Sequence, residues 1–340
     1  MAESPQPASE NAPRSAHRET ISRRATVPEA LSGQRCDQIA AQLFSEFSRG
    51  KLQQWIHSAA LTVDGAPCKT KQKLLAGMQL SLEAEFEVQS DWQAEDKPLN
   101  IVFEDAQVLV LDKAANCVVH PAPGNPSGTL ANSVLSHCPD NAELPRGGIV
   151  HRLDKDTTGL MVVAKTLAAH RSLVEQLQQR SVSRHYRALV CGQLISGGRI
   201  DAAIGRHPNN RTKMAAFPNG AAHAKPAITH YRVAQRFPHH SELNIKLETG
   251  RTHQIRVHMA QLRHPLIGDR TYNPRYRRPA DISEALNDQL QRFPRQALHA
   301  FELSFDHPTA AERCHFQADL PADYCQLLAA LEAEEKSARK

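Results

Sequence analysis

Apolar side chains in the first third of the chain recur first with helical spacing and then with strand spacing. Two short helices are predicted by apolar positions three or four residues apart, at Cys36, Ile39, Ala40, Leu43 and Phe47 and at Leu52, Trp55 and Ile56. Residues 61–63 alternate as a strand that runs into the turn Asp64-Gly65, and residues 77–82 alternate as a second strand. The pattern predicts a small αβ module over residues 27–90.

A longer series of elements predicts a second domain over residues 98–335. Apolar positions at helical spacing predict helices at 130–136 and 168–179. Short apolar runs bounded by polar residues predict strands at 99–103, 108–111, 160–163, 188–190, 227–233 and 243–247. Strands that follow one another through short turns, with few helices between them, favour an α+β fold with a mixed, mainly antiparallel sheet.

Two segments have the composition of irregular chain. Residues 1–25 contain three prolines and almost no large apolar side chain, so they are predicted to form a flexible, disordered tail. Residues 84–97 are acidic and contain several glutamines, which is typical of a linker. We therefore expect the two domains to be joined by this linker and preceded by the tail.

Composition limits the class of protein. The chain has 340 residues, of which 41% are hydrophobic, enough to bury a sizeable core. The 41 Lys and Arg residues exceed the 36 Asp and Glu residues by five, a surplus too small to indicate nucleic-acid binding by itself. Seven cysteines without a C-x-x-C pair indicate reduced thiols, and no apolar run approaches the roughly 18 residues of a membrane span. We expect a cytoplasmic protein.

Positive charge is nevertheless concentrated locally. Lys69, Lys71 and Lys73 alternate with neutral residues, which places three ammonium groups on one face if this segment is extended. Arginines also gather in the stretches 206–213 and 270–278, the second of which contains two tyrosines. For the lysines, contact with a phosphate backbone and a solvated surface are equally compatible with the spacing. The two basic loops favour contact with RNA.

The densest cluster of reactive side chains lies between two apolar runs, at residues 147–159, and includes His151, Arg152, Asp154 and Asp156. In one interpretation the two acids only accept hydrogen bonds from turn amides. In a second, the D-x-D-x-T pattern indicates a phosphohydrolase of the haloacid-dehalogenase type, although no later acidic pair for its metal ion follows. In a third, a carboxylate attacks the anomeric carbon of a ribose. Spacing alone does not choose between the two acids.

Residues 148–166, GIVHRLDKDTTGLMVVAKT, resemble the signature of the RluA-type pseudouridine synthases. The resemblance implies that Asp154 is the catalytic nucleophile and that Arg152 helps to displace the target base. Residues 184–190 resemble the second motif of this family, whose tyrosine stacks on the uracil. That tyrosine corresponds to Tyr186.

Residues 247–260 resemble the third motif of the same family. The resemblance implies that Arg256 pairs with the catalytic carboxylate. The segment also has the apolar spacing of an amphipathic helix, with Arg256 to the side of the apolar face. His151 and Arg251, which belong to the first and third motifs, are assigned to RNA binding.

The N-terminal module resembles the S4 RNA-binding module in its helix pair, its Asp64-Gly65 turn and the spaced lysines Lys69, Lys71 and Lys73, which are assigned to RNA contact. Joined to the larger domain, it most resembles the branch of the family that modifies helix 69 of 23S ribosomal RNA. The resemblance implies 23S ribosomal RNA or the assembling large ribosomal subunit as the partner. We expect no membrane contact and a monomer.

The implied reaction needs no cofactor, and the spacing of His151, His253 and His258 does not fit a metal site. Three other functions stay open: a sister synthase acting on another ribosomal or transfer RNA site, the phosphohydrolase, and a non-catalytic factor that binds ribosomal RNA. A pure RNA binder has no need for a carboxylate facing phosphates, so Asp154 argues against the last of these.

Overall fold

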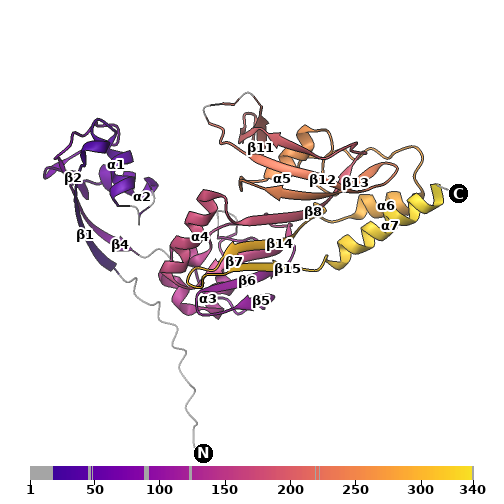
Figure 1. Cartoon of the computed structure of the whole chain (residues 1–340), viewed down its shortest axis with the longest axis horizontal. Coiled ribbons are helices and arrows are strands. Elements are labelled where there is room, and N and C mark those ends of the chain that lie inside the picture. Colours follow the sequence, from indigo (N-terminus) through magenta and orange to yellow (C-terminus); the bar gives the residue numbers. More distant parts are fainter. Residues whose placement is uncertain are drawn as a thin grey trace, which may run out of the picture. The chain divides into compact units, whose positions relative to one another are not determined.

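The computed structural model describes residues 18–44, 47, 49–87, 92–121, 125–218, 220–221 and 223–338. The chain divides into two compact units, Met1–Gln89 and Ser90–Lys340, and Figure 1 shows the elements of each. None of the helices in the described segments is long and apolar enough to cross a membrane.

The N-terminal unit combines two helices with a four-stranded antiparallel sheet of strand order β1-β4-β2-β3. Its elements are β1 (Arg18–Thr26), a 3-10 turn (Glu29–Leu31), α1 (Cys36–Leu43), α2 (Arg49–His57), β2 (Leu61–Val63), β3 (Ala66–Pro67) and β4 (Gln79–Glu87). Ile39, Leu52 and Leu80 are completely buried in its core. The predicted helix pair and both predicted strands are confirmed.

The prediction of a disordered tail is wrong for residues 18–25. These residues form most of β1, which pairs with β4 from Arg18 opposite Glu87 to Thr26 opposite Gln79. An edge strand needs few apolar side chains, because its backbone ladder holds it in place; here Ile21 is buried in the core and Ala25 packs against it. Residues 1–17 lie outside the described part of the chain.

The predicted linker over residues 84–97 is also too long. Residues 84–87 belong to β4, and Trp92 packs against the main core of the second unit. The backbone amide of Glu95 donates a hydrogen bond to the carbonyl oxygen of Asn132 at 3.0 Å. The second unit therefore begins before residue 98, because side chains of the acidic stretch contribute to its packing.

The second unit is built from many strands and five helices among the described residues. The strands are β5 (Ile101–Glu104), β6 (Val108–Lys113), β7 (Thr158–Ala164), β8 (Ser183–Cys191), β9 (Gly198–Asp201), β10 (Ala203–His207), β11 (Asn210–Phe217), β12 (Ile228–Arg236), β13 (His240–Leu247), β14 (Leu298–Asp306) and β15 (Arg313–Gln317). The helices are α3 (Leu130–His137), α4 (Leu167–Gln179), α5 (Gln254–Gln261), α6 (Glu284–Arg292) and α7 (Ala322–Ala338). Two 3-10 segments, Pro139–Glu143 and Pro145–Gly148, follow α3.

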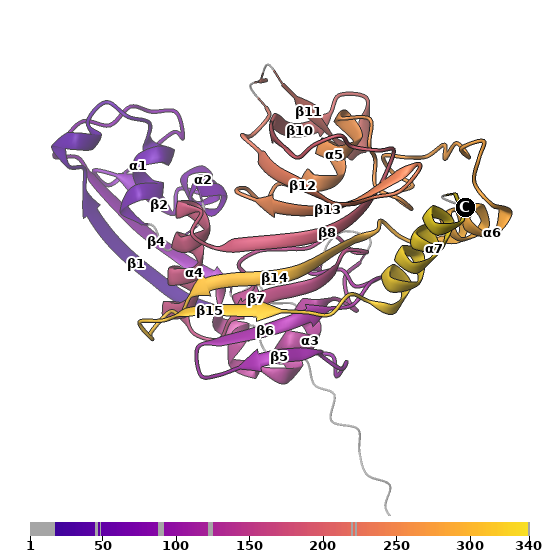
Figure 2. The ribbon, with the colours of Figure 1, turned by 45° about the vertical axis from the view of Figure 1, so that its right-hand side comes forward.

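Nine of these strands form one sheet of order β5-β6-β7-β14-β8-β13-β12-β9, with β15 paired to β14 (Figure 2). Its neighbouring strands run antiparallel except β7 and β14, which are parallel. The strands β10 and β11 form a separate hairpin. The α+β fold with a mixed, mainly antiparallel sheet is therefore confirmed.

Strand β8 carries side chains into two different cores. Tyr186 and Val190 belong to the cluster that contains Ile255 and Met259 of α5. Leu189 lies on the opposite face, in the cluster formed with α6 and α7. This alternation places Tyr186 on the face of the sheet that α5 covers.

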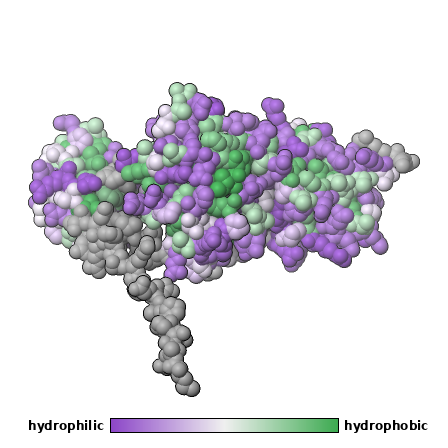
Figure 3. All heavy atoms as spheres, turned by 90° about the horizontal axis from the view of Figure 1, so that it is seen from below, coloured by the Kyte–Doolittle hydropathy of each residue, from purple (hydrophilic) through white to green (hydrophobic). Residues whose placement is uncertain are grey.

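The surface of the face seen in Figure 3 is mostly hydrophilic, with apolar side chains gathered in separate patches. Large apolar side chains are also exposed on the edge strand β5, at Ile101, Val102 and Phe103. The other strand predicted next to it, β6, is buried along almost its whole length. The two strands are similarly apolar in sequence, but only β6 is buried, because β5 lies at the edge of the sheet.

The N-terminal unit contains a buried carboxylate that organises its basic side chains. Asp37 in the first turn of α1 is completely buried. It accepts two hydrogen bonds of 3.0 Å from Arg35, one of 2.7 Å from Arg49 and one of 2.7 Å from Gln53. Burial opposes the charge of Asp37, but the bonds from Arg35, Arg49 and Gln53 lower its pKa to about 2.

We expect Asp37→Asn to lower the free energy of unfolding of the N-terminal unit by about 1–2 kcal/mol at pH 7, because charged hydrogen bonds are lost. The folded pKa lies below the unfolded value, so this advantage of the wild type is present above pH ~4 and fades as the pH falls towards 2. Urea unfolding measured from Trp55 fluorescence in a Trp92→Phe background checks this. Equal stability of both proteins at pH 7 would contradict the role of Asp37.

Candidate active site

One pocket of the second unit collects residues from four separate parts of the chain. It is lined by Arg152, Leu153, Asp154, Thr157, Arg184, Tyr186, Leu247, Gly250, Arg251, Thr252, His253, Gln254, Ile255, Arg256 and Leu298. They come from the loop before β7, from β8, from the segment joining β13 to α5 and from the start of β14. The fold therefore brings together the three motifs that the sequence singled out.

Asp154 and Arg256 meet directly in this pocket. The Nη1 atom of Arg256 donates a hydrogen bond of 3.0 Å to Oδ2 of Asp154. The other edge of the same guanidinium donates bonds of 2.7 and 2.9 Å to the two carboxylate oxygens of Asp269. Burial works against the charge of Arg256, but the two carboxylates raise its pKa above the ordinary value. Arg256 is therefore a fixed cation that orients Asp154.

Asp269 is itself held rigidly. Its side chain is 1% exposed, and its Oδ1 also accepts hydrogen bonds from the backbone amides of Thr271 and Tyr272 at 3.0 and 3.2 Å. The Asp154 side chain, by contrast, is 16% exposed and faces the pocket. The arrangement buries the structural acid and leaves the other acid accessible to a substrate.

Tyr272 covers the other side of Arg256. The guanidinium carbon lies 5.2 Å from the centre of the Tyr272 ring, within the range of a cation–π contact. The Tyr272 hydroxyl accepts a hydrogen bond from the amide of Met214 at 2.9 Å and lies 2.8 Å from Nδ1 of His253. Burial lowers the pKa of His253, which favours a neutral ring whose Nδ1 can accept a hydrogen bond from the Tyr272 hydroxyl.

Tyr186 forms part of the pocket wall. Its ring is 5% exposed, and burial raises the pKa of its hydroxyl, so the phenol stays protonated at neutral pH. An aromatic ring at the edge of a small polar pocket can stack on a planar base. The pocket thus offers a carboxylate, a fixed cation and a stacking surface side by side.

A family model described as "RNA pseudouridylate synthase" matches residues 107–261. Ribosomal large subunit pseudouridine synthase D of Pseudomonas aeruginosa is 54% identical over 93% of this chain and 98% of its own length. The protein of the same name from Escherichia coli strain K12 is 47% identical over 91% of this chain and 94% of its own. This chain belongs to the RNA pseudouridylate synthase family.

Membership in this family makes the protein an enzyme that isomerises uridine in RNA. The interpretation as a haloacid-dehalogenase-like phosphohydrolase is wrong, because the acids of its D-x-D-x-T pattern belong to a pseudouridine synthase motif. A solved structure described as human RNA pseudouridylate synthase domain containing 4 has a similar fold. It aligns with a TM-score of 0.54 and 23% identity over 68% of this chain and 93% of that chain.

Of the residues assigned to RNA binding in this pseudouridine synthase, Arg152 and Arg251 line the pocket. Arg152 is exposed, whereas Arg251 directs its Nε to the carbonyl oxygen of Pro226 at 3.1 Å. His151 does not line the pocket; its Nε2 accepts a hydrogen bond from the amide of Val162 at 3.1 Å. Burial lowers the pKa of His151 to about 3, so this histidine stays neutral and links the loop to β7.

The three lysines assigned to RNA contact belong to the N-terminal unit. Lys69, Lys71 and Lys73 are all exposed. The segment turns at residues 70–71, and the amide of Gln72 bonds to the carbonyl of Lys69 at 2.9 Å. The extended conformation on which their common face depended is therefore absent from this segment.

A buried lysine that the sequence did not single out supports the loop that carries Asp154. The Lys113 ammonium donates hydrogen bonds of 2.7, 3.0 and 2.9 Å to the carbonyl oxygens of Ala114, Cys117 and Lys155. Burial lowers the pKa of Lys113 to about 8. Lys113 is the last residue of the apolar strand β6 and is only 2% exposed. Its three hydrogen bonds to carbonyl oxygens compensate the burial of its charge.

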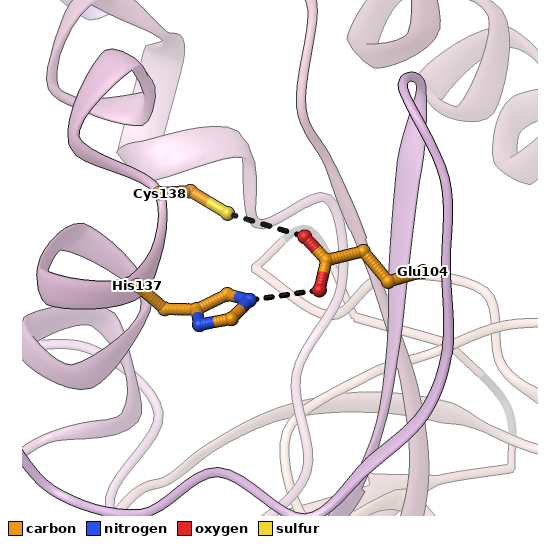
Figure 4. A group of neighbouring side chains, drawn as sticks. All are labelled: Glu104, His137 and Cys138. Carbon is orange, nitrogen blue, oxygen red and sulfur yellow. Dashed lines mark hydrogen bonds and ion pairs between the residues drawn. The ribbon is translucent and has the colours of Figure 1, made fainter.

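Among the described residues, Glu104, His137 and Cys138 form one group with the ligand types of a metal site (Figure 4). His137 lies 2.8 Å from Oε2 of Glu104, but Lys165 donates a bond of 2.7 Å to Oε1, the oxygen nearest the Cys138 sulfur. Bonds from Lys165 and His137 lower the pKa of Glu104, and burial raises the pKa of the Cys138 thiol. The charge of Glu104 is compensated by Lys165 and His137, so the group is an ion-pair cluster. None of the three residues lines the pocket.

We expect Asp269→Asn to reduce kcat about 10- to 100-fold with little change in KM, because Arg256 loses a charged partner and no longer holds Asp154 at a fixed angle. Steady-state pseudouridine formation on an RNA substrate measures both constants. Asp288→Asn, which removes an exposed acid on α6, is the matched control. An increase in KM with unchanged kcat would show that Asp269 serves RNA binding instead.

Proposed function

We propose that this pseudouridine synthase modifies uridines of 23S ribosomal RNA, at positions in the helix 69 stem-loop. The proposal is supported by relatives from Pseudomonas aeruginosa and Vibrio parahaemolyticus, both called ribosomal large subunit pseudouridine synthase D. They align with 93% and 90% of this chain. The substrate is the free RNA or the assembling large ribosomal subunit. The protein acts on it as a monomer in the cytoplasm.

The geometry that carries the catalytic part of the proposal is the contact between Asp154 and Arg256. The carboxylate of Asp154 forms a bond to C1′ of the target ribose while the N1–C1′ bond breaks, and this bond breaks again when C5 of the uracil attacks C1′. The released uracil turns on the Tyr186 ring and rejoins the ribose through C5; the proton of C5 is lost and N1 takes up a proton. Breaking the glycosidic bond builds positive charge at C1′, which a neighbouring carboxylate stabilises.

The target base must leave its stack before Asp154 can reach C1′. Arg152 is exposed at the rim of the pocket, so its guanidinium can occupy the position that the base vacates. Arg270, Arg275 and Arg277 are exposed on the loop that follows Asp269, and they supply further contacts to flanking phosphates. No group in this scheme needs a cofactor or a metal ion.

The N-terminal unit adds a second contact to the RNA in this proposal. Its exposed Lys69, Lys71 and Lys73 present positive charge near the start of α1. Arg35 and Arg49 are engaged by Asp37, so the lysines carry the phosphate contact. In this proposal the N-terminal unit is the S4-like module that the sequence resembles.

Asp154→Asn is expected to reduce pseudouridine formation at least about a thousandfold, because the amide cannot serve as a nucleophile. RNA binding, measured by fluorescence anisotropy, stays within about threefold of the wild type because phosphate contacts dominate affinity. Asp156→Asn is the matched control, since its side chain does not line the pocket. Loss of activity in Asp156→Asn, with retention in Asp154→Asn, would show that catalysis depends on the other acid.

Mapping of pseudouridine in total ribosomal and transfer RNA tests the substrate. In cells that lack this protein we expect pseudouridine to disappear from helix 69 of 23S ribosomal RNA and to return when the gene is restored. Restoration with the Asp154→Asn form should leave the sites unmodified. Loss at a different ribosomal or transfer RNA position would identify a sister synthase and refute the helix 69 assignment.

A further inference from the structure

Arg184 is a buried cation in the wall of the catalytic pocket. It lies on β8 two residues before Tyr186, and both side chains line the pocket. Arg184 is 7% exposed, and its Nε is buried without a hydrogen-bond partner among the described residues. Burial lowers the pKa of this guanidinium, and the Tyr186 hydroxyl is the ionisable neighbour that acts on it.

Among the described residues, no carboxylate forms an ion pair with Arg184. Tyr186 and His151 stay neutral, because burial raises the pKa of the first and lowers that of the second to about 3. A side chain at Gly250 would place its Cβ 2.7 Å from Nη1 of Arg184. Only glycine at this position leaves room for the guanidinium beside the pocket.

Other buried arginines of the same unit are paired. Arg256 holds Asp154 and Asp269, and Arg295, which is 4% exposed, donates bonds of 2.6 and 2.8 Å to Asp323. A buried charge without a partner is costly, so such groups in proteins are paired or bind a ligand. Arg184 is the exception among these three arginines, and it faces the pocket that holds Asp154.

We propose that Arg184 forms a subsite for a backbone phosphate of the target nucleotide, next to the base that stacks on Tyr186. This inference rests on the proposed function, because it takes RNA as the substrate. Uracil is neutral and does not compensate the buried charge, whereas a phosphate carries a full negative charge. The planar guanidinium also matches two phosphate oxygens at once, which gives orientation as well as affinity.

The test compares normal RNA with RNA that carries a neutral methylphosphonate linkage either 5′ or 3′ of the target uridine. For the wild type we expect one of the two linkages to reduce kcat/KM about 10- to 100-fold, the effect of losing one charged hydrogen-bonded pair. Arg184→Gln should show a comparable reduction on normal RNA and no further reduction on that linkage. A further reduction of equal size in Arg184→Gln would overturn the proposal.

Two variants control for general effects. Arg199→Gln removes an exposed arginine that pairs with Asp201 on β9, and it should respond to the linkages as the wild type does. Arg184→Lys keeps the charge without the planar fork and should retain part of the sensitivity. If Arg184→Gln does not fold, the proposal is tested by comparing the sensitivity of the wild type and of Arg184→Lys to the two linkages. A wild type that is insensitive to both linkages overturns the proposal.

Failure of the subsite is distinguishable from failure of the proposed function. The wild type acting on normal helix 69 RNA tests the function alone. Dissociation constants measured by anisotropy with the same RNAs report on the phosphate contact even where no product forms. Insensitivity of both binding and turnover to either linkage would refute the subsite and leave the proposed function standing.

Discussion

The candidate pocket depends on the bonds that the guanidinium of Arg256 makes with two carboxylates. This guanidinium reaches Asp154 from the loop before β7, Asp269 from the loop after α5 and the ring of Tyr272 beyond it. Segments distant in sequence are therefore tied to one planar group with a fixed donor geometry. Because Asp269 takes one whole edge of this group, the remaining donor has a defined direction, and Asp154 is held in it.

This arrangement divides two acids into different roles by burial alone. Asp269 is enclosed and receives four hydrogen bonds from Arg256 and from backbone amides. Asp154 receives one bond from the same arginine and keeps contact with the pocket. In the proposed mechanism, in which a carboxylate acts on a ribose, this avoids leaving two competing carboxylates in the same site.

Much of the fold could be predicted from periodicity, because the helices α1 and α2 and the strands β6 and β7 bury regular apolar faces. Strand β1 could not be predicted, since its stability comes from backbone pairing with β4 rather than from apolar side chains. The start of α5 at Gln254 could not be predicted either. His253 before it adopts a left-handed backbone conformation, which no apolar spacing marks.

The candidate site was predictable where side chains belong to motifs, as with Asp154, Tyr186 and Arg256. Asp269 and Arg184 were not, because their importance depends on what lies beside them after folding. Asp269 matters through its two bonds to one arginine, and Arg184 through a buried Nε that has no hydrogen-bond partner among the described residues. Both properties depend on contacts between residues distant in sequence, so no sequence motif marks them.

The parallel pairing of β7 and β14 has a consequence for the order in which the enzyme matures on the ribosome. Residues 156–158, close to Asp154 along the chain, are bonded to residues 295–299: Arg295 to the carbonyl of Asp156, Gln296 to Thr157, and His299 to Thr158. Leu298 also lines the pocket. Synthesis of the chain must therefore pass residue 299 before the pocket is complete, so the N-terminal unit of a nascent chain is synthesised well before the pocket can form.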